Sequence, residues 1–459
     1  MSFDWTRYRL EELGDIVTGK TPPSKVQDAF SYSGTQFVTP RDMDGRRWID
    51  STERFLSESG VAAVKNSLVP SGSVAVSCIG SDMGKAVLLK VESVTNQQIN
   101  TLVVDTQKFN AKFVYYVLST KQDEFKSIAG GSATPILNKG HFGKFEIDLP
   151  TKDEQDFLVR CLDSLDSKIE NNTQANQTLE QIAQALFKSW FVDFDPVKAK
   201  IDTLAAGGSD DDAELAAMSV ISAKTVDELN SLKTSNPEAF NKLAQTAALF
   251  PAAMQDSELG EIPEGWEVSD LASCTTELRR GISPKYIEEG GVLVINQKCI
   301  RNHTVDFSLA RRNDSSKRKV DGREIAIGDV LVNSTGVGTL GRLAPIRFLN
   351  ETTVADSHVT VVRANTTKIS KSFLAGLMLT NEAYIEASGA GSTGQTELRK
   401  QVLEAIKFAK PLNAVDKLFD EIVGNFNAQV AELEKQKVTL SLTRDALLPK
   451  LLSGELVGE

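Results

Sequence analysis

The sequence has no long hydrophobic run. A stretch of about 18 apolar residues, the length of a membrane-spanning helix, does not occur in its 459 residues. The first residues, MSFDWTRYRLEEL, lack the basic start and apolar core of a secretory signal peptide. The four cysteines (Cys78, Cys161, Cys274 and Cys299) show no paired spacing, which favours reduced thiols over a disulfide framework. These absences predict a cytoplasmic protein without a membrane anchor.

Motifs of catalysis and metal binding are also missing. The three histidines, His141, His303 and His358, form no ligand pair with one another or with the cysteines at metal-binding spacing. We expect no phosphate-binding loop, although residues 14–21, GDIVTGKT, have the formal spacing G-x-x-x-x-G-K-T. The Asp/Asn-Pro-Pro-aromatic motif of amino-methyltransferases is absent, and Asp193-Phe194-Asp195-Pro196 does not replace it. We therefore expect no bound metal and no catalytic activity in this chain.

One glycine motif matches a nucleotide-binding pattern only formally. Residues 336–341, GVGTLG, have the spacing G-x-G-x-x-G. The segment that follows resembles a strand rather than a helix, so no helix N-terminus would face a phosphate. We interpret the motif as a turn between strands, and leave open that its backbone amides approach a DNA phosphate.

Charge is distributed unevenly along the chain. The net charge is −11, which by itself argues against nucleic acid as a partner. Residues 196–265 contain five lysines and twelve acidic residues, a net of −7, whereas residues 279–347 contain thirteen basic and seven acidic residues, a net of +6. The acidic residues therefore concentrate in a connecting segment and the basic residues in a module, and the total charge is a poor guide to binding.

The sequence contains an internal repeat with an offset close to 260 residues. Residues 71–105 and 327–363 share a glycine-led apolar strand, a Gly-Ser/Thr-rich turn, a second apolar run, a polar turn and a third strand. The match continues from Gly131-Ser132 to Gly391-Ser392 and from Pro150 to Pro411. Such duplication predicts a pseudo-twofold protein that presents two similar surfaces.

Each repeat is predicted to be a mixed α+β module followed by a long helix. The modules span residues 1–150 and 263–410. Short β-type runs separated by turns predict strands at 35–38, 74–77, 86–91, 101–104, 292–295, 330–333 and 359–362. One helix is expected in each module, near 112–126 and 370–387.

The long helices, at 151–195 and 411–459, carry apolar residues at alternating spacings of four and three. The first seam runs from Leu158 to Trp190 and the second from Phe419 to Leu451. A seven-residue period over this length predicts a coiled coil. Asn172 and Asn176 on the first seam either fix its register or lie at a solvated bend. The predicted fold class is α+β, with two pseudo-symmetric globular domains separated by two long antiparallel helices.

The connecting segment, residues 196–262, has no counterpart after the second helix. It is predicted to be acidic and partly helical, with helices near 227–233 and 237–249 and a flexible stretch at 205–212, AAGGSDDD.

Three segments carry a resemblance to a known family. LFKSWFVDFDP (186–196), SELGEIPEGWEV (257–268) and LLPKLLSGEL (447–456) resemble conserved regions of specificity subunits of Type I restriction–modification systems. The resemblance implies a non-catalytic subunit whose two target recognition domains each read one half of a bipartite, asymmetric site in double-stranded DNA, with the helices setting the spacer. It also implies two methylation subunits and up to two restriction subunits as partners. S-adenosylmethionine, ATP and Mg would be bound by those partners and no cofactor by this chain.

DNA recognition requires cations for phosphates and polar side chains for base edges. The candidates in module one are Lys20, Lys25, Arg41, Arg46, Arg47, Lys85, Gln97, Gln98, Ser132 and Lys139. Those in module two are Arg279, Arg280, Lys285, Gln297, Lys298, Arg301, Arg311, Arg312, Lys317, Arg318, Lys319, Arg342, His358 and Arg399.

Each candidate also has a structural interpretation. Any one cation can be an ordinary surface charge, and Gln97 and Gln98 can stabilise a turn. His358 aligns with Ile99 of the first repeat, which favours a structural or partly buried role, and Trp190 and Phe191 are expected in the core. For the whole chain, a two-headed protein scaffold and an enzyme with an unrecognised site remain alternatives.

Overall fold

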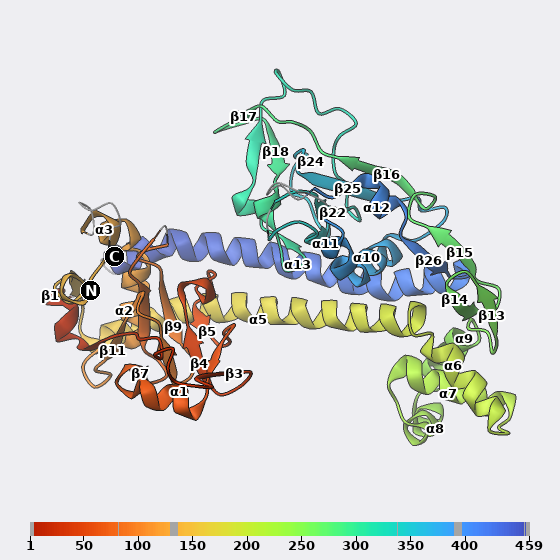
Figure 1. Cartoon of the computed structure of the whole chain (residues 1–459), viewed down its shortest axis with the longest axis horizontal. Helices are drawn as coiled ribbons and strands as arrows, with labels where there is room; N and C mark the ends of the chain where they lie inside the picture. Colours follow the sequence, from red (N-terminus) through yellow and green to blue (C-terminus); the bar gives the residue numbers. More distant parts are fainter. Residues whose placement is uncertain are drawn as a thin grey trace. The chain divides into compact units, whose positions relative to one another are not determined.

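The computed structural model describes residues 4–80, 82–128, 136–336, 338–389, 397–453 and 455. The chain forms two compact units, one of residues 1–171 with 436–459 and the other of residues 172–435. We refer to them as unit 1 and unit 2. Both boundaries fall inside long helices, α5 (Lys152–Phe191) and α13 (Asn413–Leu452), which Figure 1 shows in yellow and blue. Each unit therefore contains one globular module and a part of both helices.

Module one, in unit 1, is built on two five-stranded sheets. The first has the order β3-β6-β4-β10-β7 and the second β2-β11-β8-β9-β5. A separate pair, β1 (Thr6–Arg9) with β12 (Glu146–Leu149), joins the start and end of the module. The other strands are β2 (Gly14–Thr18), β3 (Phe30–Ser31), β4 (Thr35–Val38), β5 (Trp48–Ile49), β6 (Phe55–Leu56), β7 (Leu68–Val69), β8 (Val74–Ser77), β9 (Ala86–Leu89), β10 (Ser93–Thr95) and β11 (Ile99–Val104).

Module two, in unit 2, has two four-stranded sheets, ordered β16-β25-β22-β23 and β17-β21-β18-β24, and a closing pair of β15 with β26. Figure 1 shows the end of the second sheet, with β17 and β18, projecting from the module. Two strands at the end of the connecting segment, β13 (Met254–Ser257) and β14 (Gly260–Pro263), pair with each other. The strands of module two are β15 (Glu267–Asp270), β16 (Thr275–Arg280), β17 (Tyr286–Ile287), β18 (Val292–Ile295), β19 (Ile300–Arg301), β20 (Thr304–Val305), β21 (Arg311–Asn313), β22 (Val330–Asn333), β23 (Leu343–Pro345), β24 (Thr353–Ala355), β25 (Val359–Ala364) and β26 (Lys407–Lys410).

The strand pairing confirms the internal repeat. β11 pairs antiparallel with β8, as β25 does with β22. β10 pairs parallel with β4, as β24 does with β18. α5 and α13 both contain 40 residues, and they begin 261 positions apart. The predicted α+β class, with two equivalent modules and two long helices, is confirmed.

The single helix expected in each module is instead two. Residues 112–126 fall in α2 (Ala111–Ser119) and α3 (Gln122–Ile128), and residues 370–387 in α10 (Lys371–Thr380) and α11 (Glu382–Ala387). At the breaks, Thr120 donates its hydroxyl to the carbonyl of Val117 and Asn381 donates its amide to that of Leu377. Such local side-chain bonds compete with the helical ladder. Three shorter helices complete the modules, α1 (Glu58–Ala63), α4 (Lys139–Gly143) and α12 (Lys400–Glu404).

Within each unit the two long helices run antiparallel. In unit 1, Asp166 of α5 pairs with Arg444 of α13 at 2.9 Å, and Leu158 shares a core with Leu451. In unit 2, Asn176 donates to Glu434 at 2.6 Å, and the ring of Phe187 lies 5.8 Å from that of Phe419. Residues later in α5 thus contact residues earlier in α13, as in an antiparallel pair of helices.

The two seam asparagines are buried rather than solvated. Asn172 is 2% and Asn176 is 3% exposed, and α5 is continuous through both. The alternative of a solvated bend is therefore wrong. A buried polar residue at a helix seam favours one register, because any other would leave its amide without a polar partner.

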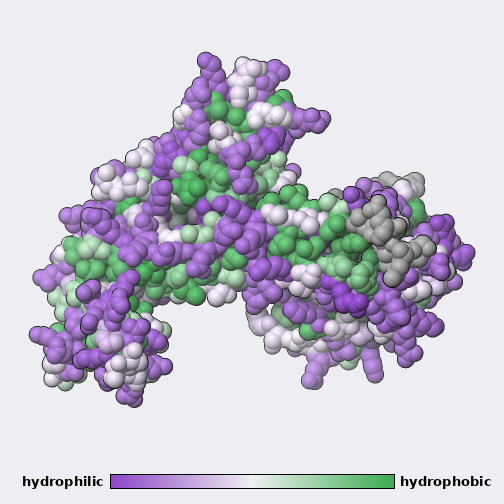
Figure 2. Space-filling model, turned by 180° about the vertical axis from the view of Figure 1, so that it is seen from behind, coloured by the Kyte–Doolittle hydropathy of each residue, from purple (hydrophilic) through white to green (hydrophobic). Residues whose placement is uncertain are grey.

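The connecting segment folds into four helices, α6 (Asp195–Ala205), α7 (Asp210–Ser222), α8 (Val226–Ser235) and α9 (Pro237–Ala247). The predicted flexible stretch at 205–212 is wrong at its C-terminal end, because Ser209 caps α7 and the aspartates form its first turn. Met218, Leu229 and Ala247 belong to a small core of their own. The face of these helices that Figure 2 shows is mainly hydrophilic. Among the described residues, no helix combines the length and apolar character needed to cross a membrane.

Module one is attached to α5 through a shared apolar core, which includes Leu158 and Leu162, and through a group of charges. The guanidinium of Arg47, with its side chain 7% exposed, lies 2.6 Å from Asp163, 3.5 Å from Asp166 and 3.0 Å from Glu170. Tyr116 of α2 donates to Asp166 at 2.5 Å. Burial by itself would lower the pKa of Arg47, but the interactions with Tyr116 and the carboxylates raise it overall.

Module two is attached mainly through aromatic side chains. Phe187 of α5 packs against Phe373 of α10 and Phe419 of α13. Gly376 of α10 permits this packing, since a Cβ there would lie 2.2 Å from the ring of Phe187. Figure 1 shows α10 and α11 next to α13 in this unit.

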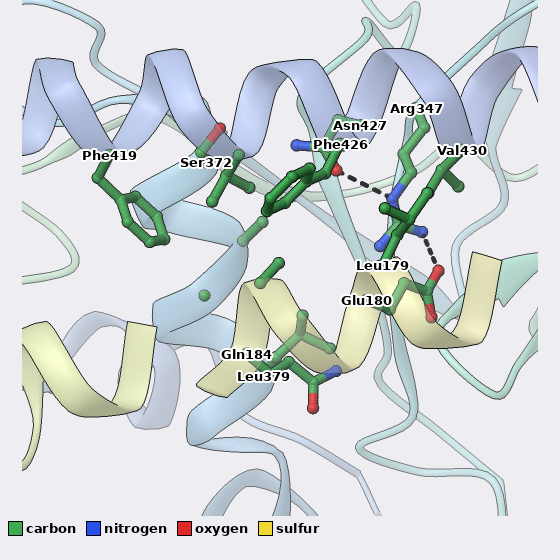
Figure 3. Close-up of a pocket in the computed structure, with 14 residues that line it drawn as sticks. Leu179, Glu180, Gln184, Arg347, Ser372, Leu379, Phe419, Phe426, Asn427 and Val430 are labelled. Atoms are coloured by element: carbon green, nitrogen blue, oxygen red, sulfur yellow. Dashed lines mark hydrogen bonds and ion pairs between the residues drawn. The ribbon is translucent and has the colours of Figure 1, made fainter. Parts of the chain in front are cut away.

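One buried ion pair accompanies the aromatic contact in unit 2. Arg347 lies 2.8 Å from Glu180 of α5 and donates to Asn427 of α13 at 3.2 Å (Figure 3). Burial lowers the pKa of Arg347 below its usual value, against the opposing effect of Glu180. A charge in this position ties the loop after β23 to both helices.

Candidate nucleic-acid interface

In module one, four segments meet around the loop that joins β10 to β11, residues 96–98. Lys20 donates its backbone N–H to Thr95, and Asn96 donates its own to Val38. Cys78, which follows β8, donates to the carbonyl of Gln98, and Leu137 donates to that of Cys78. The loops after β2, β4 and β8 and the segment before α4 therefore converge on one polar loop.

In module two, the equivalent segments meet around residues 356–358. Ile282 donates to Ala355, and Asp356 donates to Ile295. Ser334 donates to the carbonyl of His358, and Leu398 donates to that of Ser334. Burial raises the pKa of Asp356, although the N–H of His358 that it accepts opposes this. Four segments from different parts of the sequence thus form the same frame in both modules.

The frame corrects the position of His358 in the repeat. The N–H of Cys78 binds the carbonyl of Gln98 at 2.7 Å, and the N–H of Ser334 binds that of His358 at 2.8 Å. His358 is therefore equivalent to Gln98 and not to Ile99. Its side chain is exposed, so the expectation of a structural or partly buried histidine is wrong.

The structure brings about half of the predicted residues together at these loops. They lie on the converging segments or within a few residues of them, and are Lys20, Arg41, Lys85, Gln97, Gln98 and Lys139 in module one, and Arg280, Gln297, Lys298, Arg342, His358 and Arg399 in module two. Among the residues that the structure describes, Lys20, Arg41, Lys298 and Arg399 are exposed and form no ion pair. Ser132 lies outside the described residues.

Other predicted residues already hold protein partners, as Lys85 does with Asp82 and Arg280 with Glu397. The choice of Arg47 as a DNA-binding residue is corrected. Arg47 is buried between module one and α5 and cannot contact DNA without breaking its ion pairs. Arg46 pairs with Asp44 and Asp50, Arg279 with Glu277, and Lys317 with Asp314. Arg312 makes a two-bonded pair with Glu351. Such pairs reduce the charge that these side chains offer to a phosphate.

The remaining basic candidates are placed apart from the converging loops. Arg311 stacks on the ring of Tyr286 at 3.5 Å, on the projecting sheet of module two. Lys25, Lys285, Arg301, Arg318 and Lys319 are exposed. Their positions suit contacts with a phosphate backbone, which do not depend on sequence.

Several residues of the frame are not among the candidates chosen from the sequence. Thr21 donates to Gln97 at 2.6 Å, Asn100 donates to the carbonyl of Leu137 at 3.1 Å, and Thr335 contacts both Gln297 and His358. A comparison of polar residues at equivalent positions of the two repeats would have singled out the loops, though not these bonds.

No group of three His, Cys, Asp or Glu suited to a metal ion occurs among the described residues. Burial raises the pKa of the Cys78 thiol to about 12 and that of the Cys299 thiol to about 11. Neither is a nucleophile at neutral pH, because the thiolate is the reactive form.

The chain is similar to several known proteins. Residues 3–181 match the family described as Type I restriction modification DNA specificity domain. The chain is 31% identical over 366 residues to the HindI specificity subunit of Haemophilus influenzae, covering 75% of this chain and 76% of that protein. It is 24% identical over 466 residues to the MjaIX specificity subunit of Methanocaldococcus jannaschii, covering 99% and 94%.

A crystal structure of a Type I S subunit from M. genitalium superposes with a TM-score of 0.48 at 15% identity, covering 98% of this chain and 96% of that one. The identity to the Haemophilus protein, over three quarters of both chains, establishes the relationship. The chain belongs to the family of Type I restriction enzyme specificity subunits.

Proposed function

We propose that each module reads one half of a bipartite site in double-stranded DNA. The observation that carries this proposal is the repeated frame, on which the two modules present different side chains from equivalent loops. Two different reading surfaces on one chain suit an asymmetric site, which two identical surfaces would not specify. Membership in the specificity-subunit family supports it.

The loops provide both kinds of contact that sequence recognition needs. Exposed cations such as Lys20, Arg41, Lys298 and Arg399 suit phosphates, and Gln97, Gln98, Gln297 and His358 suit base edges. The net charge of −11 does not oppose this assignment, because much of the acidity lies on the connecting helices. The scaffold alternative is not favoured.

We further propose that α5 and α13 set the spacing between the two halves. Their equal length and the buried asparagines support a fixed register. A helix advances about 1.5 Å per residue, so a change in helix length would alter the spacing between the modules.

The chain is proposed to act with partner subunits in the cytoplasm. Two methylation subunits and up to two restriction subunits would carry catalysis and bind S-adenosylmethionine, ATP and Mg. Exposed apolar side chains on the long helices support docking of proteins there, namely Phe157, Ile182, Val438 and Leu442.

The test is genome-wide mapping of methylated adenine in cells that express this chain with its neighbouring methylation subunit. The expected result is one bipartite motif that disappears when the chain is deleted. If the subunits assemble and no motif depends on the chain, the proposal is wrong and the scaffold alternative returns.

A further inference from the structure

Three side chains of module two, of which His358 is exposed and Gln297 and Thr335 are half-buried, meet at the converging loops. The hydroxyl oxygen of Thr335 lies 2.8 Å from Nδ1 of His358 and 3.4 Å from Oε1 of Gln297. Gln297 lies just after β18, Thr335 after β22, and His358 just before β25. Residues from three separate strand ends therefore form one hydrogen-bonded group, which we call the Gln–Thr–His group.

The backbones that carry this group are held in place. Asn333, fully buried, donates its side-chain amide to the carbonyl of Gln297 at 3.1 Å. The N–H of His358 binds Oδ1 of Asp356 at 2.8 Å. Gly336 allows the side chain of Gln297 to lie against the loop, since a Cβ there would be 3.0 Å from Oε1. Fixed backbones with side chains that reach the surface are suited to reading a ligand without reorganisation.

A single hydroxyl proton couples the two outer side chains. If Thr335 donates to Nδ1 of His358, then Nε2 of His358 carries the proton and is a donor, and Oε1 of Gln297 is free to accept. If Thr335 donates to Gln297, Nδ1 of the neutral histidine donates to Thr335 and Nε2 becomes an acceptor. Whether Nε2 of His358 is a donor or an acceptor therefore depends on whether Gln297 accepts the hydroxyl proton of Thr335.

We propose that Gln297 and His358 are base-contacting, specificity-determining residues of module two and that Thr335 is the positioning residue that makes them read adjacent base edges as one unit. This inference rests on the proposed function and identifies its ligand as major-groove base edges, where donors and acceptors distinguish all four base pairs. Glutamine presents a hydrogen-bond donor and an acceptor together, and Nε2 of histidine adds one further donor or acceptor.

The first repeat supports the assignment by contrast. The shared frame places Pro40, Ile79 and Gln98 of module one at the positions of Gln297, Thr335 and His358. Module one thus has the same backbone frame but no equivalent of the coupled group. Because the Gln–Thr–His group is present in only one of two matching modules, we expect it to contribute to the difference between the two half-sites.

The experiment uses the full chain in complex with its methylation subunit. Binding is measured for duplexes that carry the mapped motif and for duplexes with each base pair of the motif changed singly. The variants are Gln297→Ala, His358→Ala, Thr335→Val and Thr335→Ser, with Gln98→Ala as the matched variant in module one. Amide hydrogen exchange of residues 275–410 verifies that module two keeps its fold.

The expected result is confined to one half-site. His358→Ala and Gln297→Ala each lose discrimination at one position, by roughly tenfold to a hundredfold. Thr335→Val weakens discrimination at both of these positions, Thr335→Ser restores it because the hydroxyl returns, and Gln98→Ala changes only the other half-site.

Two outcomes would overturn the inference while leaving the proposed function intact. Unchanged discrimination in His358→Ala and Gln297→Ala would remove their assignment as base-contacting residues. A Thr335→Val variant that keeps full discrimination, or loses it without rescue by serine, would remove the coupling. If the wild-type complex shows no chain-dependent motif, the proposed function and this inference both fail.

Discussion

The two modules share the order of four strands in each sheet, but the chemistry that attaches them to the long helices differs in part. In unit 1 the apolar contacts of Leu158 and Leu162 with the core of module one are joined by a network of charges around Arg47. In unit 2 the attachment is an aromatic cluster around Phe187, with one ion pair, Arg347 with Glu180. The repeat therefore preserves the frame that presents the loops, whereas the contact that holds each module on the helices differs between the repeats.

This difference predicts different responses of the two units to the same treatment. Aromatic burial depends on shape and apolar area and is insensitive to pH. Paired buried charges depend on both partners being present and ionised. Because a chain of two units need not unfold in one step, each prediction is best measured as amide hydrogen exchange resolved by unit.

The largest effect is expected for Phe187→Ala. Phe187 is 2% exposed and its ring contacts Phe191, Phe373 and Phe419. Loss of a buried phenylalanine costs about 3–5 kcal/mol, through lost burial and the cavity that remains. Protection from exchange should fall in unit 2, most clearly in α10.

Ile182→Ala is the matched control, because this side chain on the same helix is 44% exposed. Its cost should stay within about 0.5 kcal/mol. Equal effects of the two substitutions would contradict the aromatic attachment of module two.

Arg47→Ala should have the next largest effect, and in unit 1. It leaves Glu170 without its main partner, although Asp163 keeps Lys112 and Asp166 keeps Arg444. Breaking a buried pair costs about 3–5 kcal/mol, and the partial exposure of Asp163 and Glu170 places this variant at or below the lower limit. Arg46→Ala is the control, since its pairs with Asp44 and Asp50 are at the surface and contribute about 0–1 kcal/mol. The attachment is misassigned if Arg46→Ala is the more destabilising of the two.

Acid should weaken unit 1 through Asp163. Burial opposes ionisation of this carboxyl, but Lys112 and Arg47 lower its pKa overall. The unfolded pKa of an aspartate is about 3.9. The contribution of Asp163 to the stability of unit 1 is therefore complete above that pH and is lost as pH falls through its lower folded pKa. The unfolding free energy of unit 1 should therefore decrease below about pH 4, and Asp163→Asn should make that decrease shallower. An identical acid profile in this variant would exclude Asp163 as the cause.

A smaller effect of opposite sign is expected in unit 2. The hydrogen bond from His303 to Glu382, 2.6 Å long, is the main cause that raises the pKa of His303, against burial and the nearby Arg347. The contribution of this hydrogen bond to the stability of unit 2 is complete below the unfolded pKa of histidine, about 6.5. It is lost as pH rises through the higher pKa of His303 in the folded protein. Unit 2 should become less stable between neutral and mildly alkaline pH, and His303→Gln should abolish this slope. If the slope persists in the variant, another group is responsible.

Much of the fold could be predicted from the sequence, because its signals are local and repeated. The strand at 74–77 and its counterpart at 330–333 match β8 and β22, since apolar runs between turns identify buried strands. The seam from Leu158 to Trp190 was predictable from its seven-residue period. The helix breaks at Thr120 and Asn381 were not, because they depend on side-chain bonds to backbone carbonyls.

The candidate site was only partly predictable. Sequence composition indicates which residues are basic, but not which of them already have a partner, so Arg47 and the exposed Lys298 looked alike. The equivalence of His358 with Gln98 required the hydrogen bonds of Cys78 and Ser334, because loops of different length shift the alignment by one residue. Thr335 gave no signal, since its role depends on two side chains that approach it from distant segments.

A matched insertion at the unit boundaries tests most directly the proposal that α5 and α13 set the spacing between two DNA-reading modules. Seven residues that continue the seam are inserted after Asn171 in α5 and after Lys435 in α13, where contacts within each unit stay intact. A heptad adds about 10 Å of helix, or at most about three base pairs of DNA at 3.4 Å each. Mapping of the methylated motif should then give both half-sites unchanged with a longer spacer. A constant spacer with altered half-sites would contradict the account.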